Sequence, residues 1–226
     1  MPRILLFSSG PPDWQALLAD PAKHWKSSYS ARALAHSWEA ANGFPAEVEK
    51  LFQTIEPPLA NLTPLLAIPE FKVPPPGGVR ASPNDIFVLA RSSSGPVTIM
   101  VEGKVNESFG PTLKEWRSEA WIGKEERLTF VLHSLGLESE PDGSVRYQLL
   151  HRAASAIITG EQYRAAAAVL LVHSFSRERT GWSDYQAFAR LFGVEAEIGS
   201  VQQLGNASRI PLFGVWVVGN PVYLQC

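Results

Sequence analysis

Cysteine is almost absent from this chain: the only one, Cys226, ends the sequence. A single cysteine excludes an internal disulfide framework and a cysteine-based metal site, and it favours a cytoplasmic protein. Histidine is scarce too, and the five histidines show no His-x₃-His or comparable spacing. A zinc site is therefore not expected.

Long hydrophobic runs are also missing. No apolar segment approaches the roughly 20 residues that span a bilayer, so no membrane association is expected. The opening segment MPRILLFSSGPP lacks the length and the small-residue cleavage site of a secretory signal, and it predicts a first strand or an anchoring arm. Walker, dinucleotide-binding and nucleophile-elbow motifs are absent as well.

Charge of one sign is not in excess. The chain has 20 Lys and Arg against 22 Asp and Glu, a formal net charge of -2. Broad, nonspecific binding of nucleic acid generally needs a basic surface, so this balance argues against it. A local basic groove remains compatible with these numbers.

The 226 residues, 45% of them hydrophobic, predict one α/β domain over residues 1–226, with N-terminal and C-terminal elaborations. Apolar spacing, caps and stop signals predict a mixed central β-sheet flanked by helices. The expected helices are 28–43, 45–54, 112–120, 124–136, 144–158 and 182–192. The expected strands are 85–91, 96–105 and 169–175, with two short strands in 210–224 and a loop-like, proline-rich connection over 57–83.

The most informative stretch is PVTIMVEGKV, residues 96–105, in which a strand suited to a core ends in charge. Residues 85–91 and 96–105 flank the turn-forming SSSG and predict a β-hairpin. The hairpin brings Asp85, at the start of one strand, beside Glu102 and Lys104, at the end of the other. Glu102 and Lys104 share a face because side chains alternate along a strand, while Gly103 lies opposite and leaves room for a close neighbour.

Two carboxylates beside a lysine suit phosphodiester chemistry. Asp85 and Glu102 offer the hard oxygen ligands that Mg²⁺ prefers. A bound Mg²⁺ or Mn²⁺ would lower the pKa of a water and stabilise charge on a phosphate. Lys104 would orient the attacking water or neutralise the transition state.

These residues resemble the PD-(D/E)xK nuclease superfamily: Asp85, sixteen intervening residues, then Glu102-Gly103-Lys104 on an apolar strand. The resemblance extends over 28–175 in element order, is specific over 83–104, and includes an opening similar to the YSARxLAxxWExANGFP of bacterial domains of that superfamily. It implies a restriction-endonuclease-like core and a further metal-binding acid on the first helix. Glu39 fits that position best, with Glu47 and Glu49 as competitors.

The three-residue motif alone is weak, because Glu70-Phe71-Lys72 matches it within a proline-rich segment. The apolar strand and its hairpin partner distinguish Glu102 to Lys104 from that second match. The alternative is an exposed Glu–Lys pair at a strand end, which contributes little to stability.

Several other polar residues have two readings. Glu107 could be a further ligand, but a solvated loop acid is the preferred interpretation. Gln148, His151 and Arg152 lie on a helix that can contribute a polar group to the site, and Gln148 is the first choice for that role. Ordinary surface positions are nevertheless favoured for all three. His173 is expected to be a hydrogen-bonded core histidine. Arg177 and Arg179 are candidates for phosphate contact, although Glu178 between them favours a mixed-charge loop.

The sequence therefore predicts a Mg²⁺- or Mn²⁺-dependent nuclease in which Asp85 and Glu102 bind the metal, Glu39 supports it and Lys104 assists the water. Nucleic acid is the expected partner, and a homodimer is plausible by analogy with enzymes that cut two strands. The alternative is a binding or regulatory protein that keeps the fold without catalysis. DNA versus RNA stays open.

Overall fold

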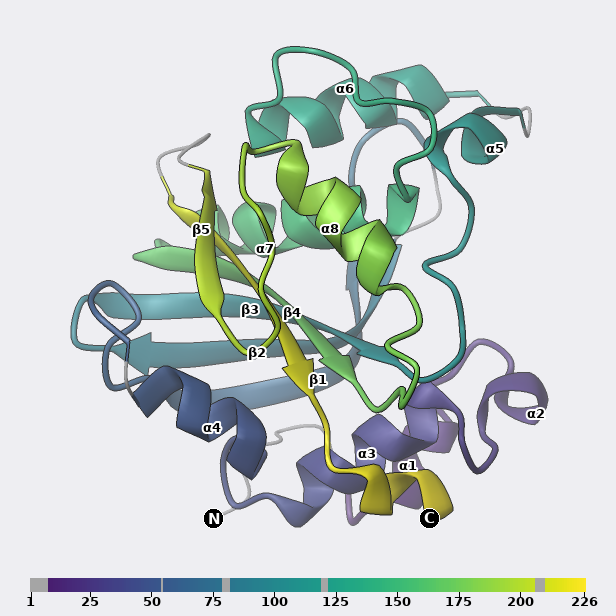
Figure 1. The fold of residues 1–226 in the computed structure, drawn as a ribbon, viewed down its shortest axis with the longest axis vertical. Helices are drawn as coiled ribbons and strands as arrows, with labels where there is room; N and C mark the ends of the chain where they lie inside the picture. Colours follow the sequence, from purple (N-terminus) through teal and green to yellow (C-terminus); the bar gives the residue numbers. More distant parts are fainter. Residues whose placement is uncertain (1–7, 54, 79–81, 119–121, 206–209) are drawn as a thin grey trace.

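A six-stranded mixed sheet forms the centre of the protein in a computed structural model, which describes residues 8–53, 55–78, 82–118, 122–205 and 210–226 (Figure 1). The strand order is β1-β2-β3-β4-β6-β5. Neighbouring strands are antiparallel except for β3–β4 and β4–β6, which are parallel. The strands are β1 (Thr63–Val73), β2 (Ser82–Ser92), β3 (Gly95–Lys104), β4 (Ala167–Ser174), β5 (Val201–Gly205) and β6 (Leu212–Val218).

Helices cover both faces of this sheet. One group comprises α1 (Pro11–Gln15), α2 (Pro21–His24), α3 (Ser30–Ala40) and α4 (Ala46–Gln53). The other comprises α5 (Leu113–Ser118), α6 (Lys124–Leu135), α7 (Tyr147–Tyr163) and α8 (Trp182–Arg190), and a 3₁₀ helix, η1 (Pro221–Gln225), follows β6. Figure 1 shows α1 to α3 with η1 at one end of the molecule and α5, α6 and α8 at the other. In the part of the chain that the structure describes, no helix is long and apolar enough to cross a membrane.

Alternating side chains of β3 pack into two separate hydrophobic cores, one on each face of the sheet. Ile99 and Val101 pack in the core that contains Leu34 and Trp38 of α3. Met100, between them, packs in the core that contains Leu150 of α7. This alternation sets the direction of the residues that follow: Glu102 and Lys104 point to the α7 face, whereas Gly103 and Val105 point to the α3 face.

The predicted hairpin is confirmed. β2 and β3 pair in antiparallel register, with Ile86 opposite Val101, and Ser92 opposite Gly95 at the turn. β3 then runs parallel to β4, so that Lys104 lies beside Ser174. A parallel pair needs a long crossover, and residues 105–166, with α5 to α7, supply it.

The proline-rich segment 57–83 is far more regular than the predicted loop-like connection with short extended pieces at most. It contains the eleven-residue strand β1, which pairs along its length with β2. β1 is an edge strand, and only its side toward β2 has to supply ladder hydrogen bonds, so Pro64 and Pro69 are tolerated. Proline favours a loop in general, but at a sheet edge it is compatible with a strand.

The C-terminal prediction needs a second correction. Residues 210–224 form one strand, β6, followed by η1, because Pro221 fixes a helical φ and the Asn220 side chain accepts from the Val222 backbone N–H at 3.0 Å. The sheet acquires its sixth strand from β5, which the sequence did not indicate. The strand or arm expected at the N-terminus falls largely on residues 1–7, outside the described residues. The α/β class and the helix-flanked mixed sheet are confirmed.

Candidate functional site

Three adjacent strands align three carboxylates at one end of the sheet. The pairs Pro69–Ile86 and Phe71–Asn84 flank Glu70 of β1 and place it opposite Asp85 of β2. Extending the β2–β3 register by one residue from Ile86–Val101 places Asp85 opposite Glu102. Residues directly opposite each other on antiparallel strands lie within side-chain reach. The sheet therefore gathers a row of acids at this end.

Lys104 is buried, not solvated. Its ammonium donates to Glu102 Oε1 at 2.7 Å, and the two side chains are 4% and 2% exposed. Longer contacts of 3.4 Å lead to the Ser108 carbonyl oxygen and to Gln148 Oε1 of α7. The ammonium also lies 4.5 Å from the centre of the Phe109 ring, within range of a cation–π interaction. The alternative of an exposed Glu–Lys pair is thus wrong.

Arg152 of α7 completes the cluster. Its Nε donates to Glu102 Oε2 at 2.5 Å, and its Nη2 lies 3.4 Å from Asp85 Oδ1. The side chain is 5% exposed, and its Nη1 has no hydrogen-bond partner among the residues that the structure describes. The sequence favours a surface position for Arg152, and that prediction is wrong because the side chain is buried. A usable signal was present, because Arg152 is four residues after Gln148 and so on the same helix face.

The pKa values of the two hairpin acids are shifted in opposite directions. Burial alone would raise the pKa of Glu102, but Arg152 and Lys104 outweigh it and lower that pKa to about 2. Burial and the neighbouring charge of Glu102 raise the pKa of Asp85 to about 6, although Arg152 and the 2.8 Å hydrogen bond from the Gly103 N–H oppose the rise. Glu102 is therefore an anion across the physiological pH range, whereas Asp85 takes up a proton at a higher pH than an ordinary aspartate.

Glu70, which the sequence did not predict to be a site residue, lies next to Asp85. It lines a small cavity together with Asp85, Leu34 and Trp14. Burial and the charge of Asp85 raise its pKa to about 8. Its φ of 50° lies in the left-handed region, which is uncommon for a residue with a side chain and is often found at functional sites. The second motif match, Glu70-Phe71-Lys72, therefore lies on β1, the strand next to the hairpin.

The hydrogen-bond partners of Glu39 lie outside the cluster of Asp85, Glu102 and Lys104. Its Oε1 accepts from the Trp14 indole N–H at 2.7 Å and from the Ser8 hydroxyl. Glu47, a competitor for the same role, accepts at 2.9 Å from His173 Nε2 and binds the Asn220 backbone N–H. The first-helix acid therefore has a structural hydrogen-bonding role here. Among the residues that the structure describes, no three or more His, Cys, Asp or Glu side chains are arranged to hold a metal ion.

Glu107 and His173 both form hydrogen bonds near the end of the sheet. Glu107 is not a solvated acid, since its carboxylate accepts from the Ser30 N–H at 2.8 Å and the Val105 N–H at 3.0 Å, which ties the start of α3 to the end of β3. His173 is confirmed as a buried, hydrogen-bonded core histidine: Trp38 Nε1 lies 3.3 Å from its Nδ1. These residues shape the site from the α3 side without entering it.

Comparison with protein families gives one match. A family described as Domain of unknown function (DUF6946) matches residues 7–221. The chain belongs to this family. Comparisons with curated proteins and with solved structures found no significant match.

In this DUF6946 protein, the oxygen atoms at the site indicate whether a divalent cation could bind there. Asp85 and Glu102 present carboxylate oxygens, the ligands that Mg²⁺ and Mn²⁺ favour. Both already face a cationic group, Arg152, and Glu70 adds a third acid nearby. The donor chemistry fits a cation at Asp85 and Glu102, and Arg152 would compete with it for the same oxygens.

Proposed function

We propose that the protein hydrolyses phosphodiester bonds of nucleic acid at the cluster of Asp85, Glu102 and Lys104. The observation that carries this proposal is the convergence, at the end of a β-hairpin, of the buried Glu102 and Lys104 with the half-buried Asp85 and the Gln148 amide. Buried charges are costly, so a protein keeps them where they are paired or functional. The restriction-endonuclease-like core that would go with this chemistry is part of the proposal.

Each residue has a role that follows from its surroundings. Glu102 stays ionised because Lys104 and Arg152 flank it, and it holds the Lys104 ammonium in one place. Lys104 is thereby fixed to orient a water or to neutralise charge on a phosphate oxygen. Asp85, with its raised pKa, is suited to accept a proton from a water near neutral pH.

Asp85 and Glu102 are the residues that would hold a Mg²⁺ or Mn²⁺ ion. Such an ion, when bound, supplies Lewis-acid activation of water and charge stabilisation at the phosphate. The chain's own contribution is to fix the two carboxylates on paired strands and to shield them with α7.

Arg152 supports a second candidate, a binding or regulatory protein that keeps the site without catalysis. Its guanidinium already contacts both carboxylates, as a metal ion would. If that pairing persists with substrate, the acids are neutralised from within and the site lacks a place for a cation. The two candidates differ in whether divalent ions bind.

The deciding experiment has two readouts on the same protein. Mn²⁺ binding is measured by calorimetry and by the shift in Tm, and cleavage is measured on single- and double-stranded DNA and RNA with Mg²⁺ or Mn²⁺. The nuclease proposal expects saturable Mn²⁺ binding that Asp85→Asn abolishes, together with metal-dependent cleavage. Lys104→Met should reduce cleavage by about 10²-fold or more, the contribution typical of a positioned acid–base or electrostatic group.

Lys114→Met is the matched control, because Lys114 is exposed on α5 and the substitution is chemically the same. It should cleave at the wild-type rate. Cleavage that survives Lys104→Met would refute the role of Lys104. A protein that binds no Mn²⁺ and cuts no substrate would favour the non-catalytic candidate.

A further inference from the structure

A cavity of about 400 Å³ opens on the opposite face of the sheet end from Lys104. Its inner wall is made by Val105, which follows β3, and Phe175, which follows β4. Both are buried. The Phe175 N–H donates to the Lys104 carbonyl oxygen at 2.7 Å, which holds the two strand ends together. The volume lies within the range of about 300–1,000 Å³ in which small-molecule sites fall.

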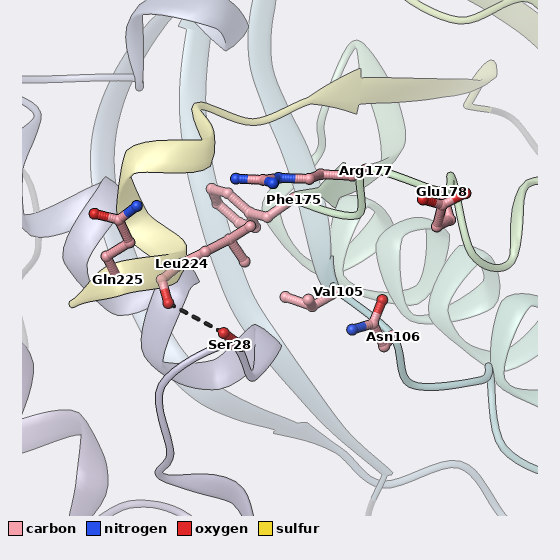
Figure 2. Close-up of a pocket in the computed structure, with 8 residues that line it drawn as sticks. All are labelled: Ser28, Val105, Asn106, Phe175, Arg177, Glu178, Leu224 and Gln225. Atoms are coloured by element: carbon pink, nitrogen blue, oxygen red, sulfur yellow. Dashed lines mark hydrogen bonds between the residues drawn. The ribbon is translucent and has the colours of Figure 1, made fainter.

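The position of this cavity is typical of ligand sites. β3 and β4 are neighbouring parallel strands, and the residues after both of them line the cavity. In open α/β sheets, ligands bind beyond the carboxyl ends of parallel strands. The far wall is η1, which Ser28 holds in place by hydrogen bonds from its N–H and hydroxyl to the Leu224 carbonyl oxygen (Figure 2).

The lining combines the cation of Arg177 with the apolar side chains of Val105, Phe175 and Leu224. Arg177 is exposed and makes no ion pair with any residue in the described ranges. In Figure 2 its side chain runs past Phe175 toward η1, while Glu178 lies on the other side. The side-chain amides of Asn106 and Gln225 also line the cavity. The cavity therefore has a positive end, an apolar middle and an acceptor-rich end.

We propose that this cavity binds a nucleoside monophosphate. The phosphate would pair with Arg177, which offers a planar fork of donors suited to phosphate oxygens. The base would lie against Val105, Phe175 and Leu224. Its ring N–H or amino donors would face Glu178 and Asn106. This inference goes beyond the proposed hydrolysis and does not depend on it, because Lys104 and Val105 point to opposite faces of the sheet.

The test titrates the whole protein with AMP, adenosine and ribose 5-phosphate, measured by calorimetry. AMP should bind saturably, and at least about tenfold more tightly than either fragment, because only AMP offers both the base and the phosphate. Arg177→Gln should weaken AMP binding by about tenfold or more, as expected when a charge-assisted hydrogen bond is lost. Arg179→Gln is the matched control, since it removes the same charge from the same loop outside the cavity, and it should bind AMP within twofold of wild type.

Three results would overturn the proposal: no saturable AMP binding at millimolar concentration, ribose 5-phosphate binding as tightly as AMP, or an equal loss in both arginine variants. Competition by a 5′-phosphorylated single-stranded oligonucleotide would identify the end of a strand as the source of the nucleotide, and its absence would identify the free nucleotide. Asp85→Asn separates the two proposals. It should abolish cleavage and keep AMP binding, so failure of either proposal is visible without the other.

Discussion

Arg152 and Glu102 form a buried ion pair that joins helix α7 to strand β3, with Nε 2.5 Å from Oε2. Glu102 holds Lys104 with its other carboxylate oxygen, so one anion accepts from two cations. Removing one partner of such a group leaves charge buried without compensation. The pair is therefore a structural requirement as well as a part of the site.

Glu102→Gln should lower the free energy of unfolding by about 3–5 kcal/mol, because Lys104 and Arg152 would both lose their buried counter-charge. Urea denaturation followed by circular dichroism measures the change. Glu125→Gln, which breaks an exposed pair with Arg117, is the control and should cost less than about 1 kcal/mol. Equal effects for the two variants would contradict the assignment of Glu102 as a buried, doubly paired anion.

Glu70→Gln should change how stability depends on pH. The folded protein raises the pKa of Glu70 from 4.5 to about 8, so the native state holds a proton that the unfolded chain releases. The stabilisation from that proton is complete below pH 4.5 and is lost as the pH rises through 8. The wild type should therefore lose stability relative to Glu70→Gln between pH 5 and 9, as measured by urea midpoints.

An exposed acid gives the comparison for that experiment: Glu56→Gln should follow the wild-type pH profile. If the Glu70→Gln profile also runs parallel to wild type, Glu70 does not lie in the field of Asp85 that the strand register implies.

Gly103→Ala should destabilise the protein by about 1–3 kcal/mol, the usual cost of overpacking. A Cβ at Gly103 would lie 3.2 Å from Leu34 Cδ2 and 3.4 Å from Asp85 Oδ2. Because the closest atom belongs to Leu34, the cost should be smaller in a Leu34→Ala background. A double-mutant cycle measures this coupling, and strict additivity would show that α3 does not press on Gly103.

His173 should carry its proton on Nε2. The Trp38 indole can only donate, and it lies 3.3 Å from His173 Nδ1, so that nitrogen must accept. Nε2 is then the donor to Glu47 Oε1 at 2.9 Å. Nitrogen NMR of labelled protein reads the tautomer directly. A signal from protonated Nδ1 at neutral pH would contradict this network, and Trp38→Phe should cost about 1–3 kcal/mol by leaving Nδ1 unpaired.

The parts of the site that could be predicted from sequence are those set by local pairing. Asp85, Glu102 and Lys104 belong to one hairpin, whose short turn fixes the register. Glu70 and Arg152 come from β1 and α7, and their position depends on how separate elements pack. The prolines of β1 hid its strand character, and Arg152 looked like an ordinary charge on a helix whose buried face the sequence did not fix.

For Glu39, the resemblance predicted a role as a metal ligand, and the structure adds a hydrogen-bonding partner that the motif did not indicate. Its carboxylate is held by Trp14 of α1, a helix that the motif does not include. Gly103 was a success of elementary reasoning, since a glycine inside a strand predicted a close neighbour and Leu34 is that neighbour.

The prolines of β1 have one more consequence, for self-association. β1 is one edge of the sheet, and exposed strand edges can recruit other chains into intermolecular β-structure. Pro64 and Pro69 remove two backbone donors from this edge, and the left-handed φ of Glu70 interrupts its regular extended geometry. β5, at the other edge, is only five residues long. Both edge strands of the sheet are therefore poorly suited to pair with a strand of another chain.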